Sequence, residues 1–190
     1  MNGTDAARRE VIRLGHPVLR QVAEPVPDRW LGTAQLRELG RDLVHTMTVE
    51  QGVGLAAPQI AEGLRLFAYW VPAFDDRPEV PPTVLVNPEI RVIGDEIAEG
   101  WEGCLSIPGL RGLVPRHRRI KVKAVDVEGI PVSLTADGFQ ARVLQHEYDH
   151  LDGIVYLDRM TSSLSLAFEP EWERYILSGS DGDEPDDDGP

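Results

Sequence analysis

The chain has 190 residues, 42% of them hydrophobic, which is enough for one sizeable core and too few for two independent domains. Its net charge of −13 excludes the basic surface that a general nucleic-acid binder needs. No apolar run approaches the ~20 residues of a membrane-spanning helix, and the first residues have no secretory signal pattern. We therefore expect a cytoplasmic protein without membrane or direct nucleic-acid contacts.

Acidic residues are unevenly distributed along the chain. Six of them, and no Lys or Arg, lie within 181–190, so the remainder carries a net charge of −7. This composition predicts one folded domain over 1–178 and an acidic, disordered tail over 179–190. The single cysteine, Cys104, excludes a disulfide within the chain, fits a reducing compartment and is a candidate for chemistry.

The first half of the chain predicts one helix followed by strands. Apolar residues recur at helical spacing and predict an amphipathic helix over 34–50. The apolar run at 64–71 predicts a buried strand, and the proline-rich segment 72–82 predicts a surface loop. Two further short strands are expected at 83–86 and 90–93.

The second half begins with a glycine-rich segment, 99–107, which predicts a flexible loop that carries Cys104. Alternating apolar and polar residues over 120–125 predict a half-buried strand. The turn at 128–129 joins it to a strand at 131–135, so these two strands form a hairpin.

A second helix is predicted to begin near Asp137, because Gln140 follows at the spacing of a capping box. Gly153 is a suitable residue to end it. Together with the expected hairpin, these elements predict an α+β fold in which short antiparallel strands surround one central helix.

This helix carries the pattern His-Glu-x-x-His. Residues four apart lie on one helical face with Cβ atoms ~5–6 Å apart, so His146 and His150 can bind one metal ion while Glu147 holds a water molecule. Such a pair is otherwise often just a polar helix face. Cys104 would supply a third ligand and leave one position open, as in catalytic sites. A thiolate with two imidazoles favours Fe(II), Zn(II) or Co(II) over Mg(II) or Ca(II).

Three segments together resemble the signature motifs of the peptide deformylases. They read GVGLAAPQ at 52–59, EGCLS at 102–106 and QHEYDH at 145–150, in the order that the family has. The segment 15–20 is similar to the family's N-terminal motif, and the resemblance covers about 11–160. It implies a metal-dependent hydrolase, with a deformylase-like α+β fold, that removes the N-formyl group from the N-terminal formylmethionine of newly made polypeptides and releases formate.

The resemblance also implies a role for each motif residue. Cys104, His146 and His150 bind one metal ion per chain, which is Fe(II) in the family and can be replaced by Zn(II), Ni(II) or Co(II). Glu147 is the general base that accepts a proton from the attacking water and passes it to the departing amine.

Further residues carry over from the motifs to the bound substrate. The side-chain amide of Gln59 and the backbone N–H of Leu105 would stabilise the developing oxyanion. The peptide would lie extended beside Gly54, where a side chain would block its approach. The expected lining of the methionine pocket is Val53, Phe139 and Val143.

Some charged residues of the motif segments have no place among the ligands. Glu102 and Asp149 are expected to orient the ligands or to pair with Arg116. Arg111 would either meet the peptide backbone or be a surface charge. The residues at 100–101 differ from those of other relatives, so we expect an unusual rim of the pocket.

The implied partners are N-formylmethionyl peptides or nascent chains, met in transient proximity to the ribosome by a monomeric enzyme. Repulsion from ribosomal RNA argues against docking by the acidic tail. Two alternatives stay open. An HExxH metallopeptidase would take its third ligand from a later acidic residue, whereas a catalytically silent relative would keep only the fold.

Overall fold

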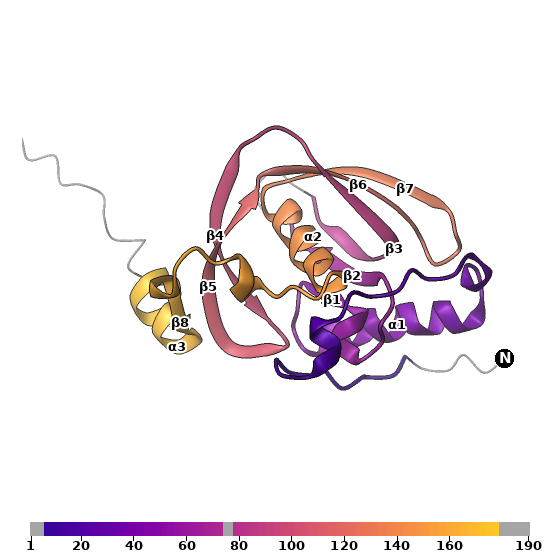
Figure 1. Ribbon diagram of the computed structural model, residues 1–190, viewed down its shortest axis with the longest axis horizontal. Helices are drawn as coiled ribbons and strands as arrows, with labels where there is room; N and C mark the ends of the chain where they lie inside the picture. The colour runs from indigo at the N-terminus through magenta and orange to yellow at the C-terminus, as the bar shows by residue number, and fades with distance from the viewer. Residues whose placement is uncertain (1–5, 74–77, 179–190) are drawn as a thin grey trace, which may run out of the picture.

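Figure 1 shows the computed structural model, which describes residues 6–73 and 78–178. Within these ranges, five antiparallel strands form one sheet in the order β1-β2-β3-β6-β7, and three form a second sheet in the order β4-β5-β8. The larger sheet consists of β1 (Gly54–Ala56), β2 (Leu66–Val71), β3 (Val80–Val92), β6 (Arg119–Val125) and β7 (Pro131–Asp137). The smaller sheet consists of β4 (Ile97–Cys104), β5 (Ile107–His117) and β8 (Leu166–Phe168). The predicted acidic tail lies outside the described residues.

The helices are fewer and mostly short. The two longer ones are α1 (Ala34–Val49) and α2 (Gly138–Leu151). The short helical turns are Pro17–Arg20, Asp28–Trp30, Ala57–Ile60, Tyr156–Arg159, Ser163–Ser165, α3 (Glu169–Trp172) and Glu173–Leu177. Between residues 6 and 178, leaving aside 74–77, no helix is long and apolar enough to cross a membrane. The α+β class with antiparallel sheets is confirmed.

Strand β2 of the larger sheet is buried on both faces. Alternate residues of a strand point to opposite faces. Leu66 and Ala68 join the hydrophobic cluster under α1, whereas Phe67 and Tyr69 join the cluster under α2. A strand covered on both sides must be apolar at every position, which explains the continuous apolar run that predicted it.

Helix α1 matches its prediction closely. Thr33 caps it, because its hydroxyl accepts a hydrogen bond from Leu36 N at 3.3 Å. The apolar face is buried against β1 and β2, and each fully buried Leu contributes about 1.5–3 kcal/mol to folding. The residues of this face are Leu36, Leu39, Leu43 and Met47.

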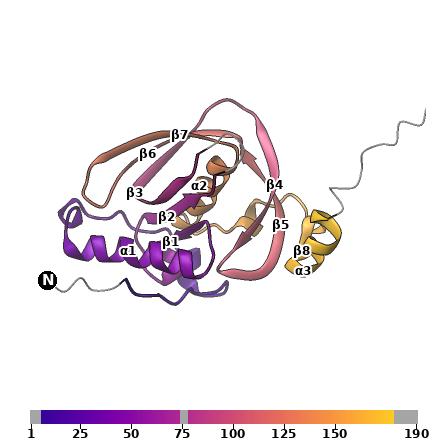
Figure 2. The ribbon, with the colours of Figure 1, turned by 180° about the vertical axis from the view of Figure 1, so that it is seen from behind.

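Helix α2 contacts strands of both sheets and lies between the larger sheet and β5 (Figures 1 and 2). It ends as predicted, since Gly153 adopts a φ of 71° and Ile154 N donates to Asp149 O at 3.0 Å. The predicted capping box is wrong. Asp137 is the N-cap residue but makes no side-chain cap hydrogen bond, and Gln140 lies 3.5 Å from the Tyr69 hydroxyl instead.

The hairpin predicted from 120–125 and 131–135 is confirmed as β6 paired with β7. The strands predicted at 83–86 and 90–93 are instead parts of the single strand β3, which is interrupted by a bulge after Val86. The predicted loop at 72–82 is correspondingly too long, because the prolines at its end lie at an irregularity in the β2–β3 pairing.

The glycine-rich segment is a strand rather than the predicted flexible loop. It forms most of β4, which pairs with β5 from Ile97 to Cys104 with an irregularity after Glu102. Two of its glycines lie against arginine side chains. A Cβ at Gly100 would lie 2.8 Å from Arg142, and one at Gly103 would lie 2.7 Å from Arg111. Glycine here allows other side chains to approach the strand, so its presence does not indicate flexibility.

Candidate metal centre

Three side chains from two elements meet at the end of β4. Cys104 is the last residue of that strand, and His146 and His150 lie one turn apart on α2. Their Sγ and ring nitrogen atoms all lie within 4.8 Å of one another, with Cys104 Sγ 3.4 Å from His150 Nε2. Both histidines are buried. Among the described residues, no second group of His, Cys, Asp and Glu side chains gathers in this way.

Hydrogen bonding orients the first histidine. His146 Nδ1 lies 2.8 Å from Glu102 Oε2, so this nitrogen donates to the carboxylate and Nε2 is left for a metal. Although burial alone would raise the pKa of Glu102, hydrogen bonds from His146 and Arg116 hold it well below its ordinary value. Burial lowers the pKa of His146, but hydrogen bonds with Cys104 and Glu102 outweigh it and raise the pKa well above the usual range.

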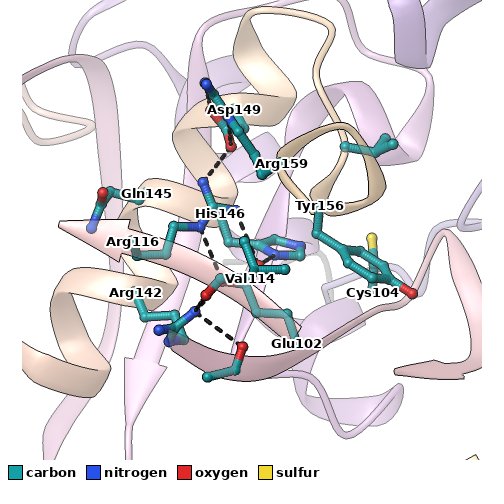
Figure 3. Close-up of polar contacts among 12 residues, drawn as sticks. Glu102, Cys104, Val114, Arg116, Arg142, Gln145, His146, Asp149, Tyr156 and Arg159 are labelled. Atoms are coloured by element: carbon teal, nitrogen blue, oxygen red, sulfur yellow. Dashed lines mark hydrogen bonds and ion pairs between the residues drawn. The ribbon is translucent and has the colours of Figure 1, made fainter. Parts of the chain in front are cut away.

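A buried network of charges extends from Glu102 (Figure 3). Arg116 donates to both oxygens of Glu102 at 3.0 Å and also to Asp149, and all three side chains are about 95% buried. Asp149 in turn accepts from Arg159 Nη2 at 2.7 Å. The pairing predicted for Glu102, Asp149 and Arg116 is therefore confirmed. Removing one partner of such a buried pair typically costs 3–5 kcal/mol.

The second histidine is prepared for metal binding in a different way. Burial, together with the nearby positive charge of His146, lowers the pKa of His150 well below its ordinary value. His150 is thus neutral, which is the form that binds a metal. Its Nδ1 is buried without a hydrogen-bond partner in the described part of the chain.

Glu147 lies between the histidines in sequence and beside them in space. It is 4% exposed, and its Oε2 has no hydrogen-bond partner within residues 6–73 and 78–178. Burial raises the pKa of this carboxyl to about 7, and a divalent cation beside it would lower the pKa again. A buried carboxylate oxygen without a partner is suited to hold a water molecule against a metal ion.

Gln59 reaches the centre from the short turn after β1. Its Oε1 accepts from Ala56 N at 2.8 Å, and its Nε2 lies 3.4 Å from Cys104 Sγ and 3.2 Å from Ser106 Oγ. The side-chain amide nitrogen therefore lies against the ligand set at Cys104. Leu105 follows Cys104 in the tight turn between β4 and β5, where its side chain covers Gly52.

A cleft of about 1270 Å³ opens beside two of the predicted ligands, Cys104 and His146. Gly54 lies in its wall, and a Cβ there would approach Glu147 Oε1 to 2.1 Å. The glycine is thus required by Glu147 itself, in addition to any peptide. Phe139 is 49% exposed at the start of α2, which excludes it from the core. The predicted pocket residues Val53, Phe139 and Val143 all line this cleft.

The structure adds residues that the motifs did not assign. Ser106 accepts from Gln59, and the Tyr156 ring stacks on His146 with 6.1 Å between centroids. Burial, together with the nearby Cys104, raises the pKa of Tyr156 to about 12. Arg142 donates to Glu102 at 2.8 Å. Ser106 could have been found, since it belongs to the second motif, whereas no local pattern marks Tyr156.

Arg111 lines the cleft but is held by the C-terminal segment. Its Nε donates to Glu169 at 2.9 Å, and its guanidinium lies 5.2 Å from the Trp172 ring centroid. The Trp172 ring lies 6.2 Å from that of Trp101, so the residue before the second motif packs against α3. The unusual rim stays a prediction.

Comparisons with known proteins converge on one family. The polypeptide deformylase family profile matches residues 8–165. Peptide deformylase 2 of Nostoc sp. is 43% identical over 173 residues, which cover 90% of this chain and 96% of that protein. Peptide deformylase 1 of Bordetella pertussis is 48% identical over 153 residues, which cover 79% of this chain and 86% of that one.

Solved structures show the same similarity. The class I type b peptide deformylase of Acinetobacter baumannii bound to Met-Ala-Ser has a TM-score of 0.77 and 37% identity, over 82% of this chain and 99% of that one. A peptide deformylase of Synechococcus elongatus in complex with actinonin has a TM-score of 0.74 and 39% identity, over 83% of this chain and 81% of that one.

Proposed function

This chain belongs to the polypeptide deformylase family, and from that premise we propose which of its residues perform the family's reaction. The protein is an enzyme, a metal-dependent hydrolase that removes the formyl group from newly made polypeptides. The observation that carries the proposal is the convergence of Cys104, His146 and His150 beside the buried Glu147.

The donor set fits the metal that the family requires. We propose that Cys104, His146 and His150 hold one Fe(II), for which Zn(II), Ni(II) or Co(II) can substitute, because one thiolate and two imidazoles suit these ions. The unpartnered Oε2 of Glu147 supports a water molecule at the open position. When bound, the cation would lower the pKa of that water and polarise the formyl carbonyl.

Glu147 is proposed to move the proton. Its carboxylate accepts a proton from the attacking water, whose oxygen forms a bond to the formyl carbon. The same carboxyl then gives the proton to the methionine nitrogen as the carbon–nitrogen bond breaks, so formate and a free amine leave. Gln59 Nε2 and the backbone N–H of Leu105 would stabilise the oxyanion in between.

We expect Gln59→Met to lower kcat by about 10²–10³-fold, because it removes the oxyanion donor but keeps the side-chain length. The formyl-peptide KM and the metal content should change little, since Gln59 touches Cys104 only through a 3.4 Å contact. Steady-state formate release and metal analysis of the same preparation would check this. A kcat within fivefold of wild type would remove Gln59 from the oxyanion site.

We expect Gly54→Ala to lower kcat by about 10²-fold, since displacing a positioned group by 1 Å can cost that much. The new Cβ would overlap the Glu147 carboxylate, with Cδ at 2.5 Å and Cγ at 2.7 Å, so the whole side chain must move. Gly63→Ala is the matched control, because nothing lies within 4 Å of a Cβ there. A loss confined to KM would instead mean that position 54 acts only on the peptide.

The substrate and the setting complete the proposal. We propose that formylmethionyl chains lie extended past Gly54, with the methionine side chain among Val53, Phe139 and Val143. The Met-Ala-Ser bound to the Acinetobacter baumannii enzyme supports a peptide in this cleft. We further propose a cytoplasmic monomer that works near the ribosome, with a single catalytic domain over 1–178 and α2 as its central helix.

Formate release from formyl-Met-Ala-Ser by the Fe(II)- or Ni(II)-loaded protein tests the proposal directly. We expect turnover that ceases when the metal is removed and returns when it is restored. A fully metal-loaded protein that releases no formate would favour the catalytically silent alternative. Family membership argues against an HExxH metallopeptidase, and so does the absence of a later acidic residue from the ligand group in the described chain.

A further inference from the structure

Arg142 is an arginine of α2 that the motifs leave unassigned, and it is fixed by an unusual number of acceptors. Its side chain is 12% exposed. The guanidinium donates to Glu102 Oε1 and to Val114 O, both at 2.8 Å, to Ala98 O at 2.6 Å and to Gly100 O at 3.3 Å. Figure 3 shows it between β4, β5 and the carboxylate of Glu102. The planar fork of arginine suits several fixed acceptors at once.

Gly100 is what makes room for this side chain. A Cβ at position 100 would lie 2.8 Å from Cζ and Nε of Arg142 and 2.9 Å from Nη2. The far end of an exposed arginine would simply move away. Here the guanidinium is held by the carbonyls on both sides, so moving it breaks the hydrogen bonds just described. Gly100 and Arg142 therefore form a complementary pair.

The carboxylate of Glu102 connects this pair to the candidate metal centre. Its Oε1 accepts from Arg142 and from Arg116 Nε, and its Oε2 accepts from Arg116 Nη2 and from His146 Nδ1. Arg116 also donates a hydrogen bond to Asp149, so its guanidinium is held by two carboxylates. Arg142 thus supplies a second donor to Oε1, and unlike Arg116 it lines the cleft.

We propose that Arg142 is a positioning residue for His146, acting through Glu102, and that Gly100 is the residue that admits it. The proposal rests on the proposed function only in taking His146 as a metal ligand. Arg142 and His146 are four residues apart on one face of α2, so a single helix carries both the ligand and the group that fixes its hydrogen-bond acceptor. Mutating a residue that hydrogen-bonds to a metal ligand, or to the acceptor of that ligand, typically lowers metal affinity or activity by about 10–100-fold.

The test measures Co(II) affinity by competition with a chromophoric chelator, together with the Co(II) ligand-field and thiolate charge-transfer bands. We expect Arg142→Met and Gly100→Ala each to weaken Co(II) binding by about 10–100-fold and to shift these bands. Arg142→Lys should bind Co(II) more tightly than the Met variant, because an ammonium can still donate to Glu102. In the double variant, Gly100→Ala should weaken Co(II) binding little beyond the effect of Arg142→Met alone, because the guanidinium that the new Cβ would displace is already absent.

Arg65→Met is the matched control, because Arg65 is also partly buried and donates to Asp152 Oδ1 at 2.7 Å and to Leu151 O at 3.1 Å without touching Glu102. It should lower the melting temperature and leave the Co(II) bands in place. If Arg142→Met fails to fold, Gly100→Ala decides, since it keeps the guanidinium in the chain. Wild-type Co(II) affinity and bands in a folded Arg142→Met or Gly100→Ala protein would overturn the proposal.

The double variant gives an independent criterion. An equal loss from Gly100→Ala with and without Arg142 would also overturn the proposal, because the glycine would then act by another route. Formate release is measured separately on wild type. A wild-type protein that binds Co(II) but releases no formate would defeat the proposed function, while the affinities of the variants would still decide the role of Arg142.

Discussion

Glu147→Ala is expected to lower turnover by about 10²–10⁴-fold, the usual contribution of a positioned general base and acid, while the metal stays bound. Both parts of this result follow from the geometry. Glu147 is outside the group formed by Cys104, His146 and His150, so its removal leaves the ligands intact. Its Oε2 is nevertheless a buried carboxylate oxygen that has no hydrogen-bond partner among the described residues.

Glu147→Gln sharpens this experiment, because it keeps the shape of the side chain and removes only the ability to take a proton. Formate release and metal content would be measured on both variants, with Glu62→Gln as a control on an acid that pairs with Arg9 away from the ligands. Turnover close to that of wild type in either Glu147 variant would exclude the general-base role. Loss of the metal from both would mean that Glu147 is a ligand after all.

The pH profile provides a second reading of the same group. A general base works as the carboxylate, so activity should fall as the pH drops through its pKa. Burial places the pKa of Glu147 at about 7, and a bound divalent cation would move it lower, so the acid limb of kcat/KM should lie below neutrality. The apparent pKa of this limb describes the Glu147 carboxyl and the metal-activated water together, because the two groups titrate as a coupled pair. Glu147→Gln should lose the limb that Glu62→Gln retains.

The spacing of residues along the chain predicted those parts of the site that lie within a single helix. The 3.6-residue period alone puts His146 and His150 on one face, and it also predicted α1 to within a residue. The sequence could not show what surrounds them. Gly100 was interpreted as part of a flexible loop, because the arginine that occupies the space beside it is 42 positions later in the chain. Glycine in a strand and glycine in a loop look alike until the partner is known.

The same limit explains the other differences. The bulge in β3 interrupts its apolar pattern, so the sequence predicted two short strands. The pairing with β6 on both sides of the bulge shows that they form one strand. Ser106 holds Gln59 from 47 residues away, so its position in a motif could not disclose its partner. By contrast, pairing with Arg116 was one of the two roles expected for Glu102, since a buried acid next to a ligand needs a cation.

Cys104→Ser is expected to lose most of the metal, with a weakening of binding of at least about 10²-fold. A full set of four ligands is worth about 10–16 kcal/mol for zinc, so one ligand accounts for a few kcal/mol. A serine hydroxyl keeps its proton near neutral pH and is a poor replacement for a thiolate. Metal content after dialysis, and the loss of the thiolate charge-transfer band from the Co(II) protein, would measure the effect.

This variant also separates the two kinds of HExxH enzyme. A metallopeptidase that takes its third ligand from a later acidic residue would keep its metal in Cys104→Ser, whereas a centre built on Cys104 would release it. Cys104→Asp offers a matched comparison, because it restores an anionic ligand of a harder kind and should recover part of the affinity for Zn(II). Full metal content and full turnover in Cys104→Ser would require a different third ligand, and the assignment of the metal centre would then be wrong.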